Sequence, residues 1–208
     1  MWSLSRAAGA KAVVIACNTA SAVALPDLEE NLAVPTLGVI APGALLATQT
    51  SRSGRIGVIG TAGTIASGRY QEIIRSHAPL PQVFVQACPL LVPLVEEGLL
   101  DHRATRLIAE EYLAPLKEHH IDALVLGCTH YPLLKPLLAE ICGAHITLID
   151  SATAVAQSVA DLLGEQDLLS THTTHADRFF ATDRGGRFES IGQSDLGEAL
   201  QNLEWDDL

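Results

Sequence analysis

Short aliphatic runs that alternate with helix-like stretches constrain the fold of this chain more than any other feature of its sequence. Most of these runs are continuous, which is typical of strands that are covered on both faces. The runs that we expect to form strands are residues 12–16, 36–40, 56–59, 83–86, 123–126, 146–149 and 179–181. Strands separated by helices and short turns form parallel sheets through right-handed crossovers. The sequence therefore predicts an α/β fold.

Helix boundaries are predicted from the residues that flank the helix-like stretches. Residues 101–119 have apolar side chains at helical spacing, and Asp101 is the expected N-cap. The apolar face of that helix is predicted to contain Leu107, Ile108, Tyr112, Leu113 and Leu116. A later helix is expected to run to Val159, with Asp150 or Ser151 as its cap.

The charge balance limits the partners of this chain. Lys and Arg number 13 against 24 Asp and Glu, which gives a net charge of −11. Nucleic acids and anionic membranes bind cationic faces, so this balance argues against both. Two uncharged stretches, 31–51 and 76–95, are interrupted by Pro and Gly and cannot be spanning helices. The four cysteines include no close pair, so a reducing cytoplasm is expected.

The N-terminal region has one alternative interpretation. Arg6 and Lys11 precede the apolar residues 12–16 and Cys17, as in a lipoprotein signal. That apolar run is shorter than the ~7–15 residues of a signal core, which favours a strand. The lipoprotein alternative predicts a processed chain that begins at Cys17.

An internal repeat carries the chemistry of the sequence. Residues 12–19 read Ala-Val-Val-Ile-Ala-Cys-Asn-Thr, and residues 123–130 read Ala-Leu-Val-Leu-Gly-Cys-Thr-His. In each copy a cysteine, Cys17 or Cys128, follows an expected strand and precedes a helix. Ligands bind at the carboxyl ends of such strands, and a helix N-terminus favours a thiolate. The repeat predicts two related halves whose thiols face one ligand.

The other two cysteines, Cys88 and Cys142, lack the repeated setting, and we expect them in the hydrophobic core. The glycines at 57, 60 and 63 depart from the dinucleotide-binding spacing, so a backbone cradle for a carboxylate is the preferred interpretation. Cys128 and His130 have no second pair at zinc-ligand spacing, so metal is not expected.

The reaction class is predicted from the pair of thiols. A cysteine hydrolase needs one thiolate and one base, and a dithiol oxidoreductase prefers two cysteines close in sequence. Inversion of a carbon centre instead needs one group to remove a proton from one face and another to deliver a proton to the opposite face. Two matched thiols fit that requirement, so two-base racemisation is the predicted chemistry.

These residues resemble the cofactor-independent glutamate racemases of the aspartate/glutamate racemase superfamily. The motifs that carry the resemblance are residues 16–21, 38–43, 64–70, 88–89, 91–96 and 126–134. The resemblance implies two pseudosymmetric halves with the active site between them, here residues 1–41 with 150–208, and residues 42–149. It also implies that L-glutamate and D-glutamate interconvert without pyridoxal phosphate or metal, supplying D-glutamate for peptidoglycan. A homodimer is an arrangement that the sequence leaves open.

The same resemblance implies roles for individual residues. Cys17 would act on the D-glutamate face of the α-carbon and Cys128 on the L-glutamate face. The residues expected to hold the substrate carboxylates are Asn18, Thr19, Thr64 and Thr129. Two further residues, Glu96 and His130, are expected to assist near Cys128.

One departure from the family affects the expected activity. The family opens with a strand and an Asp-Ser-Gly motif, followed later by a Pro-Tyr-Gly segment, and neither motif occurs in this chain. We therefore expect an N-terminally incomplete first half. Two alternatives stay open: an impaired paralogue that binds glutamate or a protein partner, and an aspartate or hydantoin racemase that uses the same cysteines.

Overall fold

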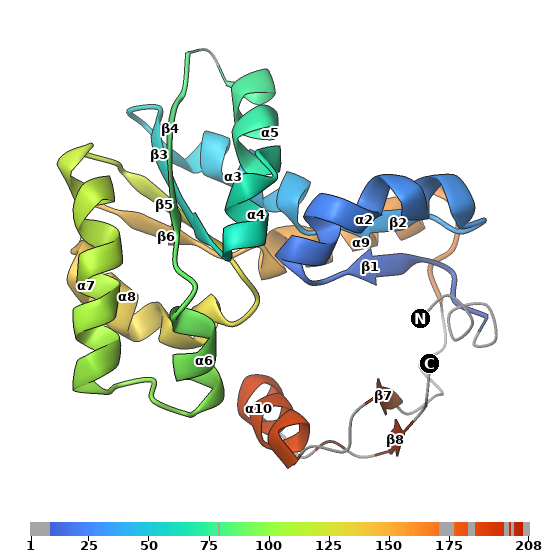
Figure 1. The fold of residues 1–208 in the computed structure, drawn as a ribbon. Helices are drawn as coiled ribbons and strands as arrows, with labels where there is room; N and C mark the ends of the chain where they lie inside the picture. The colour runs from blue at the N-terminus through green and yellow to red at the C-terminus, as the bar shows by residue number, and fades with distance from the viewer. Residues whose placement is uncertain are drawn as a thin grey trace. The chain divides into compact units, whose positions relative to one another are not determined.

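The computed structural model of the chain describes residues 9–78, 80–170, 177–182, 186–197, 200 and 202–205. These residues fall into two compact units, which are described separately (Figure 1). The first unit is Ala10–Leu168, and the second contains Gly9 and the described residues from Leu169 onward. Both boundaries of the expected halves, at 41/42 and 149/150, lie inside the first unit, so that division stays a prediction.

A four-stranded parallel sheet organises the first unit. Its strands in spatial order are β4 (Gln82–Ala87), β3 (Arg55–Gly60), β5 (Ala123–Gly127) and β6 (Thr147–Ile149). The two central strands pair in parallel, with Gly60 opposite Gly127 at their carboxyl ends. A separate parallel pair consists of β1 (Val13–Ile15) and β2 (Thr36–Gly38). The predicted α/β class with parallel sheets is confirmed.

Helices cover both faces of the four-stranded sheet (Figure 1). One face packs against α3 (Ile40–Thr50) and α5 (Arg69–His77), and the other packs against α6 (Leu91–Glu96), α7 (Arg103–Glu118), α8 (Lys135–Cys142) and a 3₁₀ helix, Tyr131–Leu134. The remaining helices of this unit are α2 (Asn18–Asn31), α4 (Ala62–Ala66) and α9 (Ala152–Glu165). Within β5, Ala123 and Val125 belong to the first core, and Leu124 and Leu126 belong to the second. Because both faces are buried, the strand has a continuous aliphatic sequence.

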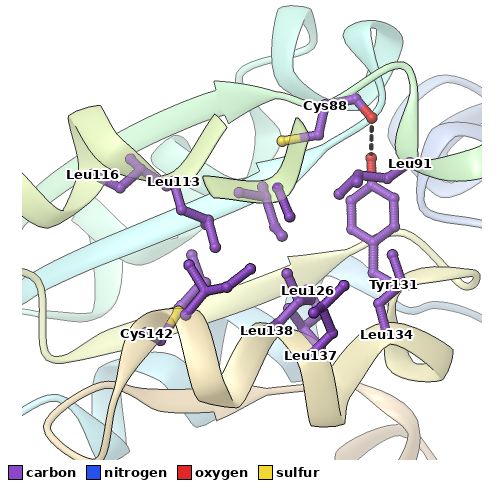
Figure 2. Packing of buried hydrophobic residues seen from close by; sticks show 14 of the residues in the cluster. Cys88, Leu91, Leu113, Leu116, Leu126, Tyr131, Leu134, Leu137, Leu138 and Cys142 are labelled. Atoms are coloured by element: carbon purple, nitrogen blue, oxygen red, sulfur yellow. Dashed lines mark hydrogen bonds between the residues drawn. The ribbon is translucent and has the colours of Figure 1, made fainter. Parts of the chain in front are cut away.

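Figure 2 shows the core beneath α7 and α8. Leu113 and Leu116 of α7 belong to the same buried cluster as Leu138 of α8. Each such leucine contributes about 1.5–3 kcal/mol by leaving water. The Tyr131 hydroxyl donates to the Cys88 carbonyl oxygen at 2.8 Å, which satisfies two polar groups inside this core. In the part of the chain that the structure describes, no helix has the length and apolar character needed to cross a membrane.

Three details of the predicted helices are wrong. The N-cap of α7 is His102, whose Nδ1 accepts from the Ala104 N–H, and Asp101 lies one residue outside. Leu107 is 54 % exposed because the buried face of α7 is set by Thr105, Ala109, Leu113 and Leu116. The last long helix, α9, continues past Val159 to Glu165. Its predicted cap is confirmed, since Ser151 is the N-cap residue and Asp150 accepts from the Ala152 N–H.

The described residues of the second unit form a short parallel sheet and one helix. Its strands are β7 (Phe179–Ala181), which the sequence predicted, and β8 (Leu203–Trp205), which it did not. The helix is α10 (Gly186–Leu196). Arg178, the residue before β7, forms an ion pair with Glu204 of β8. Its guanidinium carbon lies 4.9 Å from the centroid of the Phe180 ring.

Asp122 anchors the loop that leads into β3. Its carboxylate accepts from the Ser51 hydroxyl and from the backbone N–H groups of Arg52 and Ser53. Burial raises the pKa of Asp122, but these hydrogen bonds outweigh burial and lower the pKa below its ordinary value. A depressed pKa stabilises the fold above the unfolded pKa, and this stabilisation is lost as pH falls through the folded pKa.

We expect the free energy of unfolding of Asp122→Asn to be below that of wild type at pH 7, because the amide accepts these N–H groups more weakly. The difference shrinks as pH falls below about 4, the unfolded pKa of aspartate. Urea unfolding at a series of pH values measures it. The exposed Asp101 provides the control, Asp101→Asn. A difference that stays constant with pH for Asp122→Asn contradicts the assignment.

Candidate active site

The two repeated cysteines both follow parallel strands. Cys17 comes after β1 and is the N-cap of α2, and Cys128 comes directly after β5. Cys17 is exposed, whereas Cys128 is only 6 % exposed. A charge on Cys17 raises the pKa of Cys128, so the two thiols, both in the first unit, are close enough to interact electrostatically. The expected placement at carboxyl strand ends is therefore observed.

The surroundings of Cys128 act on its ionisation in opposite directions. Burial is the largest influence and raises the pKa of Cys128, and the charges of Cys17 and Glu96 raise it further. Hydrogen bonds from the backbone N–H groups of His130 and Tyr131 lower the same pKa. The N–H groups after the strand favour the thiolate, as expected, but burial outweighs them and the pKa of the thiol is raised overall.

His130 connects Cys128 to a carboxylate. Its Nδ1 lies 3.8 Å from the Cys128 Sγ, and its Nε2 lies 3.3 Å from Oε1 of Glu96 at the end of α6. A histidine held by a carboxylate can exchange a proton with a neighbouring thiol and stabilise its charge. Glu96 and His130 therefore lie beside Cys128, as the resemblance implied.

Three threonine hydroxyls lie within hydrogen-bond distance of one another at the N-terminus of α4. Thr19 Oγ1 lies 2.7 Å from Thr61 Oγ1 and 3.0 Å from Thr64 Oγ1, and the last two oxygens are 3.0 Å apart. Thr61 also caps α4 by accepting from the Thr64 N–H. Sequence reasoning missed Thr61. The available signal was its position after β3, immediately before a helix.

The glycines near this cluster serve packing. A Cβ on Gly63 would lie 3.1 Å from the Thr19 methyl carbon, and one on Gly60 would lie 3.3 Å from the Thr64 Cβ. On the core side of β3, a Cβ on Gly57 would lie 2.6 Å from Ile121. At these three positions the absent side chain leaves room for neighbouring protein atoms. The prediction of a carboxylate cradle did not include this packing role.

The remaining predicted carboxylate ligands differ in their surroundings. Asn18 is 3 % exposed and accepts at Oδ1 from the Tyr70 hydroxyl at 2.7 Å. Thr129 is exposed in the turn that follows Cys128. Asn18 and Thr129 are the residues immediately after the two cysteines, beyond the carboxyl ends of β1 and β5, which belong to separate sheets.

The other two cysteines belong to the core, as predicted. Cys88 and Cys142 are buried, and burial raises their pKa values to about 12 and about 11. Their thiols are therefore protonated at neutral pH. Among the described residues, no group of three or more His, Cys, Asp or Glu side chains is arranged to hold a metal ion.

Comparisons with known proteins all indicate the same family. The family model described as Asp/Glu/Hydantoin racemase matches residues 2–159. A glutamate racemase of Syntrophus aciditrophicus is 50 % identical over 195 residues, covering 93 % of this chain and 72 % of that protein. A glutamate racemase of Chlorobaculum tepidum is 46 % identical over 196 residues, with the same coverage of 93 % and 72 %.

Solved structures give the same result. A glutamate racemase isoform from Bacillus anthracis superposes with a TM-score of 0.94 at 37 % identity, covering 100 % of this chain and 78 % of that one. The glutamate racemase of Francisella tularensis in complex with D-glutamate superposes with a TM-score of 0.90 at 35 % identity, covering 98 % and 76 %.

Proposed function

The chain belongs to the aspartate/glutamate/hydantoin racemase family, and we propose from this premise that it interconverts L-glutamate and D-glutamate. The observation that carries the proposal is the pair of thiols, each placed between a parallel strand and a helix, and close enough for the charge of Cys17 to act on Cys128. Relatives named glutamate racemase, one of them solved with D-glutamate, support glutamate as the substrate.

The proposed reaction is a proton exchange at the α-carbon. The Cys128 thiolate removes the α-proton of L-glutamate, and the Cys17 thiol delivers its own proton to the opposite face, which gives D-glutamate. Cys128 then carries a proton and Cys17 is the thiolate, ready for the reverse direction. One C–H bond breaks and one forms, so the step needs no oxidant or reductant.

The electrostatics of the site support this assignment of two bases. Because a negative charge on Cys17 raises the pKa of Cys128, the pair favours one negative charge over two. A racemase of this kind needs one thiolate and one thiol at the start of each turnover. His130 and Glu96, beside Cys128, would hold or move the proton at that thiol.

Substrate binding is proposed to use the polar groups around the thiols: Asn18, Thr19, Thr64 and Thr129. Hydroxyl and amide donors suit the two carboxylates of glutamate. Local donors are needed because the net charge of −11 repels an anionic substrate at long range. Enclosure of the substrate would strengthen these interactions by excluding water.

The cellular setting is a further part of the proposal. All four cysteines are free, which supports a reducing cytoplasm. D-glutamate made there would serve peptidoglycan synthesis.

A homodimer is also proposed, and sedimentation velocity distinguishes a 22.0 kDa monomer from twice that mass.

We expect Glu96→Gln to lower kcat/KM about tenfold, because the neutral amide holds the His130 ring less firmly beside Cys128 than the carboxylate does. The loss is equal in both directions, since enantiomers in water have an equilibrium constant of one. Polarimetry with L-glutamate and with D-glutamate measures it. Glu111→Gln removes the same charge from an exposed position of α7 and should leave kcat/KM unchanged. Equal activities for the two variants would contradict a role for Glu96.

Competition between substrates tests the proposed specificity. The purified chain is given glutamate and aspartate together, and the enantiomers of each are separated by chiral chromatography over time. Preferential racemisation of glutamate is expected. Preferential racemisation of aspartate, or of a hydantoin in a parallel assay, would place the chain with the sister activities of the family.

A further inference from the structure

Tyr70 is a buried residue that the proposed chemistry does not use. It lies in the first turn of α5, after Gly68 with its φ of 70°, and is 1 % exposed. Its hydroxyl donates to Oδ1 of Asn18 at 2.7 Å, across 52 positions of sequence. This bond joins α5 to the residue that immediately follows Cys17.

The ring of Tyr70 also lies against the second cysteine motif. A Cβ added to Gly127, the residue before Cys128, would lie 3.2 Å from Cε2 of this ring. Burial raises the pKa of Tyr70, and the charge of Cys128 raises it further, so the phenol keeps its proton. Tyr70 therefore contacts both cysteine motifs and remains a hydrogen-bond donor at neutral pH.

The bond from Tyr70 fixes the orientation of the Asn18 amide. Since Oδ1 accepts the buried phenol proton, the Nδ2 group with its two N–H donors must point the other way. A flipped amide would leave that phenol proton without its acceptor in a buried place, which costs about 1–3 kcal/mol. Among the described residues, no group hydrogen-bonds to Nδ2 of Asn18.

We propose that Tyr70 is a positioning residue that orients Asn18 so that its Nδ2 donates to a carboxylate of the substrate. The inference rests on the proposed function, because it takes glutamate as the ligand. Tyr70 would then strengthen ligand binding through Asn18, and its phenol would take no part in proton transfer.

The test is Tyr70→Phe, which keeps the ring against Gly127 and removes only the hydroxyl. Isothermal titration calorimetry with D-glutamate is expected to show a Kd about tenfold higher than wild type, about 1.4 kcal/mol. KM should rise by about the same factor with kcat nearly constant, as for an interaction made equally in the ground and transition states.

A double-mutant cycle separates positioning from general structural support. Asn18→Ala alone should raise Kd at least as much as Tyr70→Phe, and the double variant should bind no more weakly than Asn18→Ala. Additive losses would overturn the proposal, as would a wild-type Kd for Tyr70→Phe.

Thr105→Val is the matched control. Thr105 is fully buried and donates to the Leu99 carbonyl oxygen at 2.6 Å, so the variant also loses one buried hydroxyl. Its melting temperature should fall while its Kd for D-glutamate stays at the wild-type value. A wild-type chain that binds D-glutamate without racemising it would contradict the proposed function, and the Kd ratio of Tyr70→Phe would still decide the positioning role. A wild-type chain that does not bind glutamate contradicts both.

Discussion

Replacement of Cys128 by serine is expected to lower the racemisation of glutamate by at least about 10³-fold, since a hydroxyl is far less acidic than a thiol and serves poorly as base. Cys17→Ser should have the same effect, because each turnover needs both groups. The serine side chain has nearly the volume of cysteine, so the fold should persist. Circular dichroism of each variant and a racemisation assay in both directions check this.

Cys142→Ser is the control for these two variants. Cys142 is buried at the end of α8, in the hydrophobic core, and burial raises its pKa to about 11. This variant should lose thermal stability while its racemisation rate stays at the wild-type level. Full activity in either Cys17→Ser or Cys128→Ser would contradict the assignment of two thiol bases.

Gly127→Ala is expected to be the most destabilising single-methyl addition among the glycines of the four-stranded sheet. The new Cβ would lie 2.7 Å from the backbone oxygen of Ile59 and 3.2 Å from the Tyr70 ring. A backbone oxygen in a central strand cannot move aside, so the two central strands must separate. We expect a loss of about 3 kcal/mol, which lowers Tm by about 6–12 °C in a chain of this size. Scanning calorimetry measures the change.

The comparison variant is Gly57→Ala in the same sheet. Its Cβ would lie 2.6 Å from Ile121 Cδ1 and 3.0 Å from Leu124 Cδ1, and both of these atoms end flexible side chains. Rotation of those side chains absorbs part of the overlap, so the fall in Tm should be smaller. Equal falls for the two variants would contradict the steric account of Gly127.

The strands were predictable wherever burial on both faces produced an aliphatic run. The four residues from Ala123 to Leu126 are all buried, and such a strand is evident in the sequence. The strand β8 was missed because Glu204 interrupts its three residues, so no run forms. The cap of α7 was misplaced by one residue because Asp101 is the commoner cap type, whereas His102 makes the bond.

The site residues were predictable where they belong to a local sequence motif. Cys17 and Cys128 were found because each stands at the end of a strand, and a short repeat reveals that position. Thr61 and Tyr70 were not assigned, because their contacts depend on tertiary packing. Tyr70 reaches Asn18 across 52 positions of sequence, and no local pattern records this contact. The raised pKa of Cys128 was also beyond sequence reasoning, since it depends on burial.

The most direct test of the central claim is loss of the α-proton signal of glutamate in D₂O, followed by NMR with the purified chain. A two-thiol racemase takes deuterium from solvent at the α-carbon, so the α-proton signals of both L-glutamate and D-glutamate should disappear. Far-UV circular dichroism on the same sample establishes that the chain is folded. A folded chain that leaves both α-protons in place would contradict racemisation of glutamate.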